Sequence, residues 1–241
     1  MLIKTRAIVL HSIKFGESQY IVDMFAEATG RVAFIQKVLP SGRGKIRKQL
    51  FQPLSLLDIE FDLRSKVRLQ RLKEARLLVP YATIPFDPYK LSLTIFVAEF
   101  LLHVTRNEQQ NKPLFEYVAA SLQWLDGCER SFSNFHLVFM MRLSLFVGFF
   151  PNLDEADDGV FFDFRAGCFV RQQPLHPDFL APADAARLRV LMRMTFDNMH
   201  LFAMSRVERN LCVDFILKYY RLHFPDFPEM KSLDVMKSLF A

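Results

Sequence analysis

The apolar positions of the first 80 residues come in short runs separated by turn signals, which is the pattern of a β-sheet domain. Five runs each contain a strand of about five to nine residues, several with period-two alternation. In the third run, alternation places Val32 and Phe34 on a buried face and Arg31 and Ala33 on the opposite one. With one long connection at 39–49, the pattern predicts a small closed barrel: an OB-fold as leading candidate, an SH3-like barrel as alternative. The runs cover residues 3–13, 18–25, 31–38, 54–62 and 68–77.

Beyond residue 81 the apolar spacing becomes helical. Asp87 followed by Pro88 is a helix start, with the Asp side chain as N-cap and Pro in the first turn. The apolar stripe of this helix, expected to face the core, consists of Leu91, Ile95, Ala98 and Leu102. Further helices are predicted at 113–126, 133–148, 182–199, 206–223 and 232–240, and a short β-hairpin-like strand pair near 152–180.

The two regions also differ in charge. Residues 1–80 contain 15 Lys or Arg and 7 Asp or Glu, whereas residues 81–241 contain 16 and 19. A balance that reverses along the chain suggests two domains with different partners, because charge that serves solubility alone would be spread evenly. We therefore predict a basic OB-fold β-barrel that binds nucleic acid in residues 1–80, followed by an α-helical, partner-binding domain in residues 81–241.

No residue pattern predicts catalysis or a bound metal. The GRGK sequence at 42–45 is followed by Ile46, whereas a phosphate-binding P-loop needs Ser or Thr after its Lys. The six histidines show no metal-ligand spacing, and no nucleophile elbow is present. We expect a protein that is not an enzyme and holds neither metal nor cofactor.

The chain also lacks the patterns of membrane and secreted proteins. Its longest apolar runs are broken by Glu99 and Arg142, so neither offers the roughly 18 apolar residues of a membrane helix. The first residues carry no signal-peptide pattern, and three widely separated cysteines suit a reducing compartment. We expect a cytoplasmic protein with no membrane partner.

Positive charge without compensating acids gathers around the long connection of the barrel, since no Asp or Glu occurs from Ala28 to Leu57. Such a stretch is either a solvated loop or a site for nucleic-acid phosphates. Phe15 and Phe51, beside glycine or basic loops, are the candidates for stacking on bases. The candidate DNA-binding residues are Arg31, Lys37, Arg43, Lys45, Arg47 and Lys48, and, around the fifth strand, Arg64, Lys66, Arg68 and Arg71. Alternation directs Lys66 and Arg68 to the face of Gln70, and Arg71 to the other.

The chain resembles the RecO DNA repair proteins in the order of several segments. Their N-terminal domain is matched by MLIKTRAIVLHSIKFGESQYIVDMFAEATGRVAFIQKV, the basic loop SGRGKIRK and LFQPLSLLDIEF. The resemblance continues through FHLVFMMRLSLFVGFFPNL and FFDFRAGCF to YYRLHFPDFPEMKSLDVMKSLF, and so covers essentially the whole chain. It implies an OB-fold followed by a helical domain, and a non-catalytic recombination mediator associated with the nucleoid.

The resemblance also implies partners. RecO proteins bind single- and double-stranded DNA and anneal complementary strands. With RecR they help RecA load onto DNA coated by single-strand DNA-binding protein, whose C-terminal tail they contact. Because such a tail is acidic with an apolar end, we expect cations at the rim of an apolar groove in the helical domain. The candidates are Arg142, Arg130, Arg193 and Lys218.

One segment departs from the family pattern. Many RecO proteins carry a four-cysteine zinc module after the helix that here ends in LFVGFFPNL, whereas this chain has Cys168 as its only thiol there. One cysteine does not make a tetrahedral zinc site, so we predict no zinc. The apolar core expected in its place consists of Phe161, Phe162, Phe164 and Phe169.

Two alternatives of other classes stay open on the sequence alone. The first is a nucleic-acid-processing enzyme that uses the barrel as a substrate clamp and whose catalytic residues follow no recognisable pattern. The second is a protein-interaction adaptor with no DNA role, in which the basic loop is simply solvated.

Overall fold

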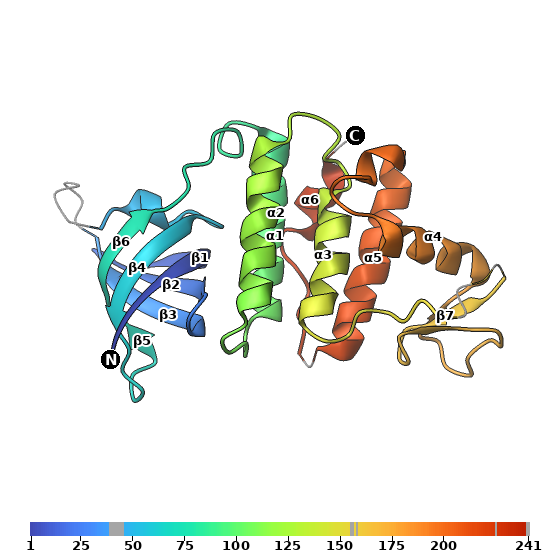
Figure 1. Ribbon diagram of the computed structural model, residues 1–241, viewed down its shortest axis with the longest axis horizontal. Helices are drawn as coiled ribbons and strands as arrows, with labels where there is room; N and C mark the ends of the chain where they lie inside the picture. The colour runs from blue at the N-terminus through green and yellow to red at the C-terminus, as the bar shows by residue number, and fades with distance from the viewer. Residues whose placement is uncertain (39–45, 155–156, 158, 225, 240–241) are drawn as a thin grey trace. The chain divides into compact units, whose positions relative to one another are not determined.

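The computed structural model describes residues 1–38, 46–154, 157, 159–224 and 226–239 (Figure 1). The chain forms two compact units: Met1–Gly127 together with Met230–Leu239, and Cys128–Glu229. The sequence-based domain boundary at residue 80 differs from this division, because two helices that follow residue 80 pack with the barrel. The predicted domain assignment stays a prediction. Within the described residues, no helix is both long and apolar enough to cross a membrane.

The first unit is built on a six-stranded sheet with the order β5-β3-β2-β1-β4-β6. Only Arg71 separates β5 from β6, so one stretch of chain pairs in parallel with β3 at its start and antiparallel with β4 afterwards. The hydrogen-bonded order is not a closed ring, and the arrangement is the partly open five-stranded barrel of an OB-fold. The strands are β1 (Leu2–Phe15), β2 (Gln19–Ala26), β3 (Gly30–Lys37), β4 (Leu56–Asp62), β5 (Leu69–Gln70) and β6 (Leu72–Leu77).

Alternating side chains fill the interior of this barrel. Val32 and Phe34 are buried, and Phe34 meets Phe61 edge-on with the ring centroids 5.0 Å apart, which confirms the face predicted for the third strand. A single 3-10 turn, η1 (Lys48–Phe51), leads into β4 and directs Phe51 into the same core. Phe51 is only 2% exposed, so its predicted role in base stacking is wrong.

Two long helices follow the sheet in the first unit: α1 (Pro88–Val104) and α2 (Lys112–Gly127). Asp87 caps α1 as predicted, since its carboxylate accepts the N–H groups of Tyr89 and Lys90 at 2.8 and 3.1 Å. The predicted apolar stripe was partly wrong: Leu91 and Ile95 are 44% and 46% exposed. The helix is apolar on all sides, so spacing alone did not select its buried face, which includes Leu93, Phe96, Val97, Phe100 and Leu101.

The β2–β3 turn and the end of the chain both contact these helices. Gly30 has φ of 72°, and a Cβ there would lie 2.3 Å from the backbone of Gln109, so only glycine fits this turn. Near the C-terminus, Glu99 of α1 accepts the N–H groups of Lys231 and Ser232, both at 2.8 Å. These bonds hold α6 (Leu233–Ser238) in the first unit although the chain has passed through the second.

The second unit combines three helices with a small sheet of order β8-β7-β9. The fourth helix ends before residue 199, where the sequence placed its end, because Thr195 and Asn198 bond to each other's backbone N–H and replace the helical bonds. The elements are α3 (Phe135–Phe146), β7 (Phe161–Asp163), β8 (Cys168–Val170), β9 (Phe179–Leu180), α4 (Pro182–Arg193), the 3-10 turn η2 (Met199–Leu201) and α5 (Arg206–His223).

An aromatic cluster joins the small sheet to α5. Phe162 lies edge-on to both Phe164 and Phe169, with ring centroids 5.6 and 5.0 Å away, and all three are buried. Tyr219 of α5 contacts this group and donates its hydroxyl to the carbonyl of Phe149 at 2.7 Å. Three of the four phenylalanines predicted to form an apolar core therefore do so, while Phe161 is half-buried; the absence of zinc stays a prediction.

Candidate nucleic-acid interface

An exposed apolar row crosses three strands on the outer face of the barrel. Ile13 lies opposite Ile21, and Ile21 opposite Ile35, so the three side chains point to one side of the sheet. None belongs to the barrel core; Ile13 is 46% exposed, and the other two are half-buried. We call Ile13, Ile21 and Ile35 the isoleucine row.

A β-bulge in β1 places these side chains outside. The register with β2 shifts between Val9 and His11. Before the shift, the odd-numbered Ala7 and Val9 point into the core, and simple alternation would send Ile13 there as well. The extra residue reverses the faces, so that Ile13 and, by alternation, Phe15 turn outward.

The next row of paired residues on the same face of the sheet, which we call a register row, ends in an aromatic ring. Phe15 lies opposite Gln19, and Gln19 opposite Lys37, directly before the turn at Gly16. The Phe15 ring is 51% exposed, so the structure leaves it accessible for the stacking role predicted from the sequence. The same turn also contains an acidic residue, Glu17.

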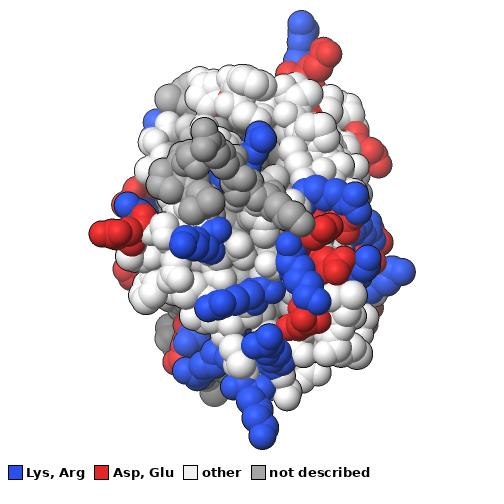
Figure 2. All heavy atoms as spheres, turned by 90° about the vertical axis from the view of Figure 1, so that its left-hand side faces the viewer, with Lys and Arg blue, Asp and Glu red and all other residues white. Residues whose placement is uncertain are grey.

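A basic loop lies at the β3 edge, and its end is one register row from Ile35. Leu69 of β5 pairs with Ala33 of β3, so the loop of residues 63–68 that precedes it emerges at the β3 edge. Residues 64–68 are exposed, including all three cations predicted in this loop. Figure 2 shows Lys and Arg side chains predominating on the lower part of the barrel face, where this loop lies in Figure 1.

A buried glutamine holds the basic loop in place. The Gln70 side chain accepts the N–H of Arg64 at 3.1 Å, and it donates to the carbonyls of Arg64 and Val67 at 3.0 and 2.6 Å. Because 64–68 is an exposed loop whereas Gln70 is buried, the shared face predicted for Lys66, Arg68 and Gln70 was wrong. The sequence contained no signal for this role of Gln70.

The described cations of residues 1–80 divide into two groups. One group is paired with carboxylates of the same unit at 2.5–3.0 Å, and its members are Lys4, Arg6, Arg31, Lys73 and Arg76. In the other group no carboxylate of the described residues lies within ion-pair distance, and its members are Lys14, Lys37, Arg47, Lys48, Arg64, Lys66, Arg68 and Arg71. We call the second group the unpaired cations.

Several DNA-binding candidates from the sequence take different positions in this division. Arg31 bonds Asp23 at 3.0 Å and the carbonyl of Leu102 at 3.1 Å, so its charge is used within the unit. Lys48 lies over the ring of Tyr20, 5.7 Å from its centroid. Arg43 and Lys45 lie outside the described residues. The sequence reasoning missed Lys14, which lies opposite Tyr20 in the register of β1 and β2.

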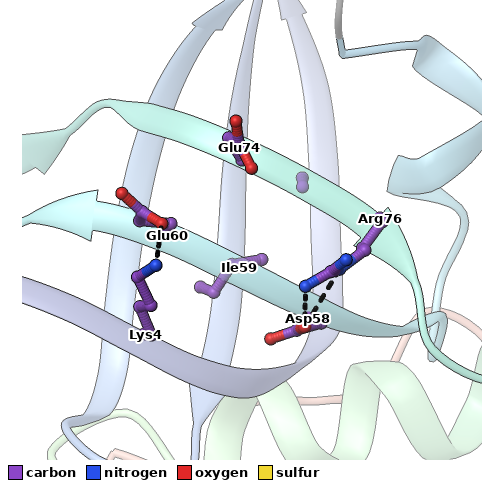
Figure 3. Close-up of a pocket in the computed structure, with 7 residues that line it drawn as sticks. Lys4, Asp58, Ile59, Glu60, Glu74 and Arg76 are labelled. Carbon is purple, nitrogen blue, oxygen red and sulfur yellow. Dashed lines mark hydrogen bonds and ion pairs between the residues drawn. The ribbon is translucent and has the colours of Figure 1, made fainter.

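The opposite part of the sheet has the reverse electrostatic character. A hollow of about 430 Å³ on β1, β4 and β6 is lined by two cations and three acids, namely Lys4, Arg76, Asp58, Glu60 and Glu74 (Figure 3). Lys4 bonds Glu60 and Arg76 bonds Asp58, both at 3.0 Å, and the hydrogen bond that Lys4 donates to Glu60 raises the pKa of Lys4. Glu60 also lies directly opposite Glu74. The surplus of negative charge makes this surface unsuited to phosphate.

The cations predicted to bind a partner tail lie in the second unit. Arg142 donates to the carbonyl of Met194 at 3.1 Å. Lys218 bonds Asp178 at 3.2 Å and lies 5.2 Å from the centroid of the Phe164 ring. Arg130 and Arg193 are exposed. Among the described residues, no group of three or more His, Cys, Asp or Glu side chains is arranged to hold a metal ion.

Comparison with known proteins covers almost the whole chain. The family model described as "Recombination protein O N terminal" matches residues 1–81, and "Recombination protein O C terminal" matches residues 85–233. The chain is 49% identical over 241 residues to the "DNA repair protein RecO" of Phocaeicola vulgatus and 48% identical to that of Bacteroides fragilis. The identity with the protein of the same name from Porphyromonas gingivalis is 35% over 247 residues. Each alignment covers 100% of both chains.

Proposed function

The chain belongs to the recombination protein O family of DNA repair proteins, and on that premise we propose that it is a non-catalytic mediator that holds DNA on the unpaired cations. A role in DNA repair and recombination follows from the family itself. The finer proposal is that the protein binds single and double strands, anneals complementary strands, and helps RecA load onto DNA coated by single-strand DNA-binding protein. It would do so in the cytoplasm, at the nucleoid.

The observation that carries this proposal is the division of the cations. Lysines and arginines already bonded to carboxylates gain little from a phosphate, because binding would require them to give up an existing partner. Eight others in residues 1–80 have no such partner among the described residues. Contacts of this kind hold the sugar-phosphate backbone without reading base sequence.

The unpaired cations also suggest how two strands could be brought together. Lys14, Lys37, Arg47 and Lys48 belong to the ends of β1 and β3 and to the start of η1, whereas the other four belong to residues 64–71. Two DNA strands repel each other through their phosphates, and neutralising both lowers this repulsion so that base pairing can proceed. We therefore assign the annealing activity to the barrel.

We assign partner binding to the helical region. RecR and the tail of single-strand DNA-binding protein are the partners proposed for it, with RecA engaged indirectly. Arg130 and Arg193 are the better candidates for contact with an acidic tail, because they are exposed. Arg142 and Lys218 would first have to leave the carbonyl and carboxylate groups that they bond within the unit.

The test is the salt dependence of oligonucleotide binding. If three loop cations contact phosphates of a single strand, their replacement lowers the slope of log K against log salt by about 0.7 each, or about 2 in all. A matched control removes the same charge from paired cations. The test variant carries Arg64→Ala, Lys66→Ala and Arg68→Ala, and the control carries Lys4→Ala, Lys73→Ala and Arg76→Ala.

An equal loss of slope in both variants would mean that net charge alone is measured, and would overturn the proposed site. Annealing of complementary strands in a chelator completes the test, since a mediator needs no divalent metal. Strand cleavage that requires a divalent metal would instead favour a processing enzyme. Salt-insensitive or absent binding would favour a protein-interaction adaptor.

A further inference from the structure

We infer that the isoleucine row and Phe15 form a seat for unstacked bases, which gives single strands a contact that duplex DNA does not make. This inference rests on the proposed DNA-binding function. It names the form of DNA that the site prefers and the residues that select it.

The first step concerns the size and continuity of the surface. Single exposed apolar side chains are ordinary on proteins, but here three isoleucines are adjacent across three strands and Phe15 lies in the next register row. Strands lie about 4.8 Å apart, so the row spans about 10 Å. The row is therefore long enough for the ring of an unstacked base to lie flat on it.

The second step concerns what borders the row. The unpaired Lys37 shares the register row of Phe15, and the basic loop of residues 64–68 emerges at the β3 edge beside Ala33. Asp23, the acid on this face, is neutralised by Arg31 at 3.0 Å. An apolar strip with cations nearby complements a single strand, whose bases are apolar on their faces and whose backbone is anionic.

The third step separates single strands from duplexes. In a duplex the bases face one another and only phosphates, sugars and base edges reach a protein surface. An apolar row offers nothing to those groups, whereas an unpaired base can lie flat on Phe15 or on the aliphatic side chains. The cations therefore serve both forms of DNA, and the row serves single strands.

The experiment compares an ordinary oligonucleotide with one of the same length that contains abasic sites, so that the phosphates are equal and the bases differ. The wild-type protein is expected to bind the ordinary strand about 5- to 150-fold more tightly. Phe15→Ala together with Ile13→Ala should abolish most of this difference, while affinity for duplex DNA and the salt slope stay unchanged. Phe15→Trp should retain the preference and give a fluorescence signal on binding.

Each outcome distinguishes the inference from the function on which it rests. Equal affinity of the wild-type protein for ordinary and abasic strands overturns the base seat but leaves the cation site intact. An equal loss of single-strand and duplex affinity in the Phe15 and Ile13 variant also overturns it, because the row would then act through the fold. A row that binds a protein instead would leave DNA affinity unchanged in that variant. No salt-dependent binding to either strand would overturn the proposed function itself.

Discussion

Replacing Gln70 tests whether the order of the basic loop matters separately from its charge. Its side chain makes three hydrogen bonds to the backbone of Arg64 and Val67 and is 5% exposed. A hydrogen bond of this kind contributes about 1 kcal/mol net, so Gln70→Ala should lower the free energy of unfolding by about 2–3 kcal/mol. DNA would then have to order the loop on binding, and we expect about a tenfold weaker affinity, equivalent to 1.4 kcal/mol.

The salt slope of this variant should match that of the wild type, because all the cations remain. Gln36→Ala is the matched control, since the Gln36 amide makes one longer bond, to the carbonyl of Lys37 at 3.3 Å. Amide exchange at Val67 and fluorescence anisotropy of a labelled oligonucleotide measure the two effects. Unchanged exchange and unchanged affinity in Gln70→Ala would refute the bracing role. A salt slope reduced as much as in the triple Ala variant would show that the variant had lost the phosphate contacts of the loop cations, and not only the order of the loop.

Three other positions give sharp tests of the first unit. Burial opposes ionisation of Glu99, but the hydrogen bonds from Ser232 and the backbone lower its pKa below 4.5. The contribution of Glu99 to stability is therefore present above pH 4.5 and is lost as the pH falls further. Proteolysis of the C-terminal segment in acid would detect this loss. In denaturant unfolding, Gly30→Ala should lower the free energy of unfolding by more than about 2 kcal/mol, and Gly16→Ala by about 1 kcal/mol. Both glycines have positive φ, but only at Gly30 would a Cβ meet backbone atoms. Equal losses in the two variants would contradict this. The Asp126 carboxylate accepts three backbone N–H groups at 2.8–2.9 Å. Asp126→Ala should therefore lower the unfolding free energy by about 2–4 kcal/mol. A change below about 1 kcal/mol would show that these three hydrogen bonds are dispensable.

The strands and most helix boundaries were predictable because they depend on local patterns. The period-two alternation of β3 and the Asp-Pro start of α1 are confirmed residue by residue. Errors arose where a local pattern was interrupted, or where it did not indicate which face of an element is buried. A 3-10 turn buried Phe51, and the uniform hydropathy of α1 concealed its buried face. The outward position of Ile13 depends on a bulge in β1 that the sequence did not reveal.

The candidate site was only half predictable, for a reason that lies in strand pairing. The sequence shows where the cations are, but whether each meets an acid depends on which residues lie opposite. Arg76 lies opposite Asp58 in β4, and Lys4 opposite Glu60, so both are neutralised. Arg64, Lys66 and Arg68 lie in a loop and have no residue opposite them. The register therefore converts a generally basic domain into one surface with surplus acid and one with available cations.

The separation of an acidic surface from a surface with available cations bears on why a mediator would use such a barrel. Annealing has to work on any pair of complementary strands, so the contacts must not depend on base sequence. Phosphate contacts meet this requirement, and so does apolar contact with base faces, since every base has one. The proposed seat consists of three isoleucines and a phenylalanine, which have no groups to hydrogen-bond a base edge. A row of Asn or Arg side chains in the same place would bind as well but would favour particular bases. The apolar character of the row is thus the property that a sequence-indifferent annealing surface requires.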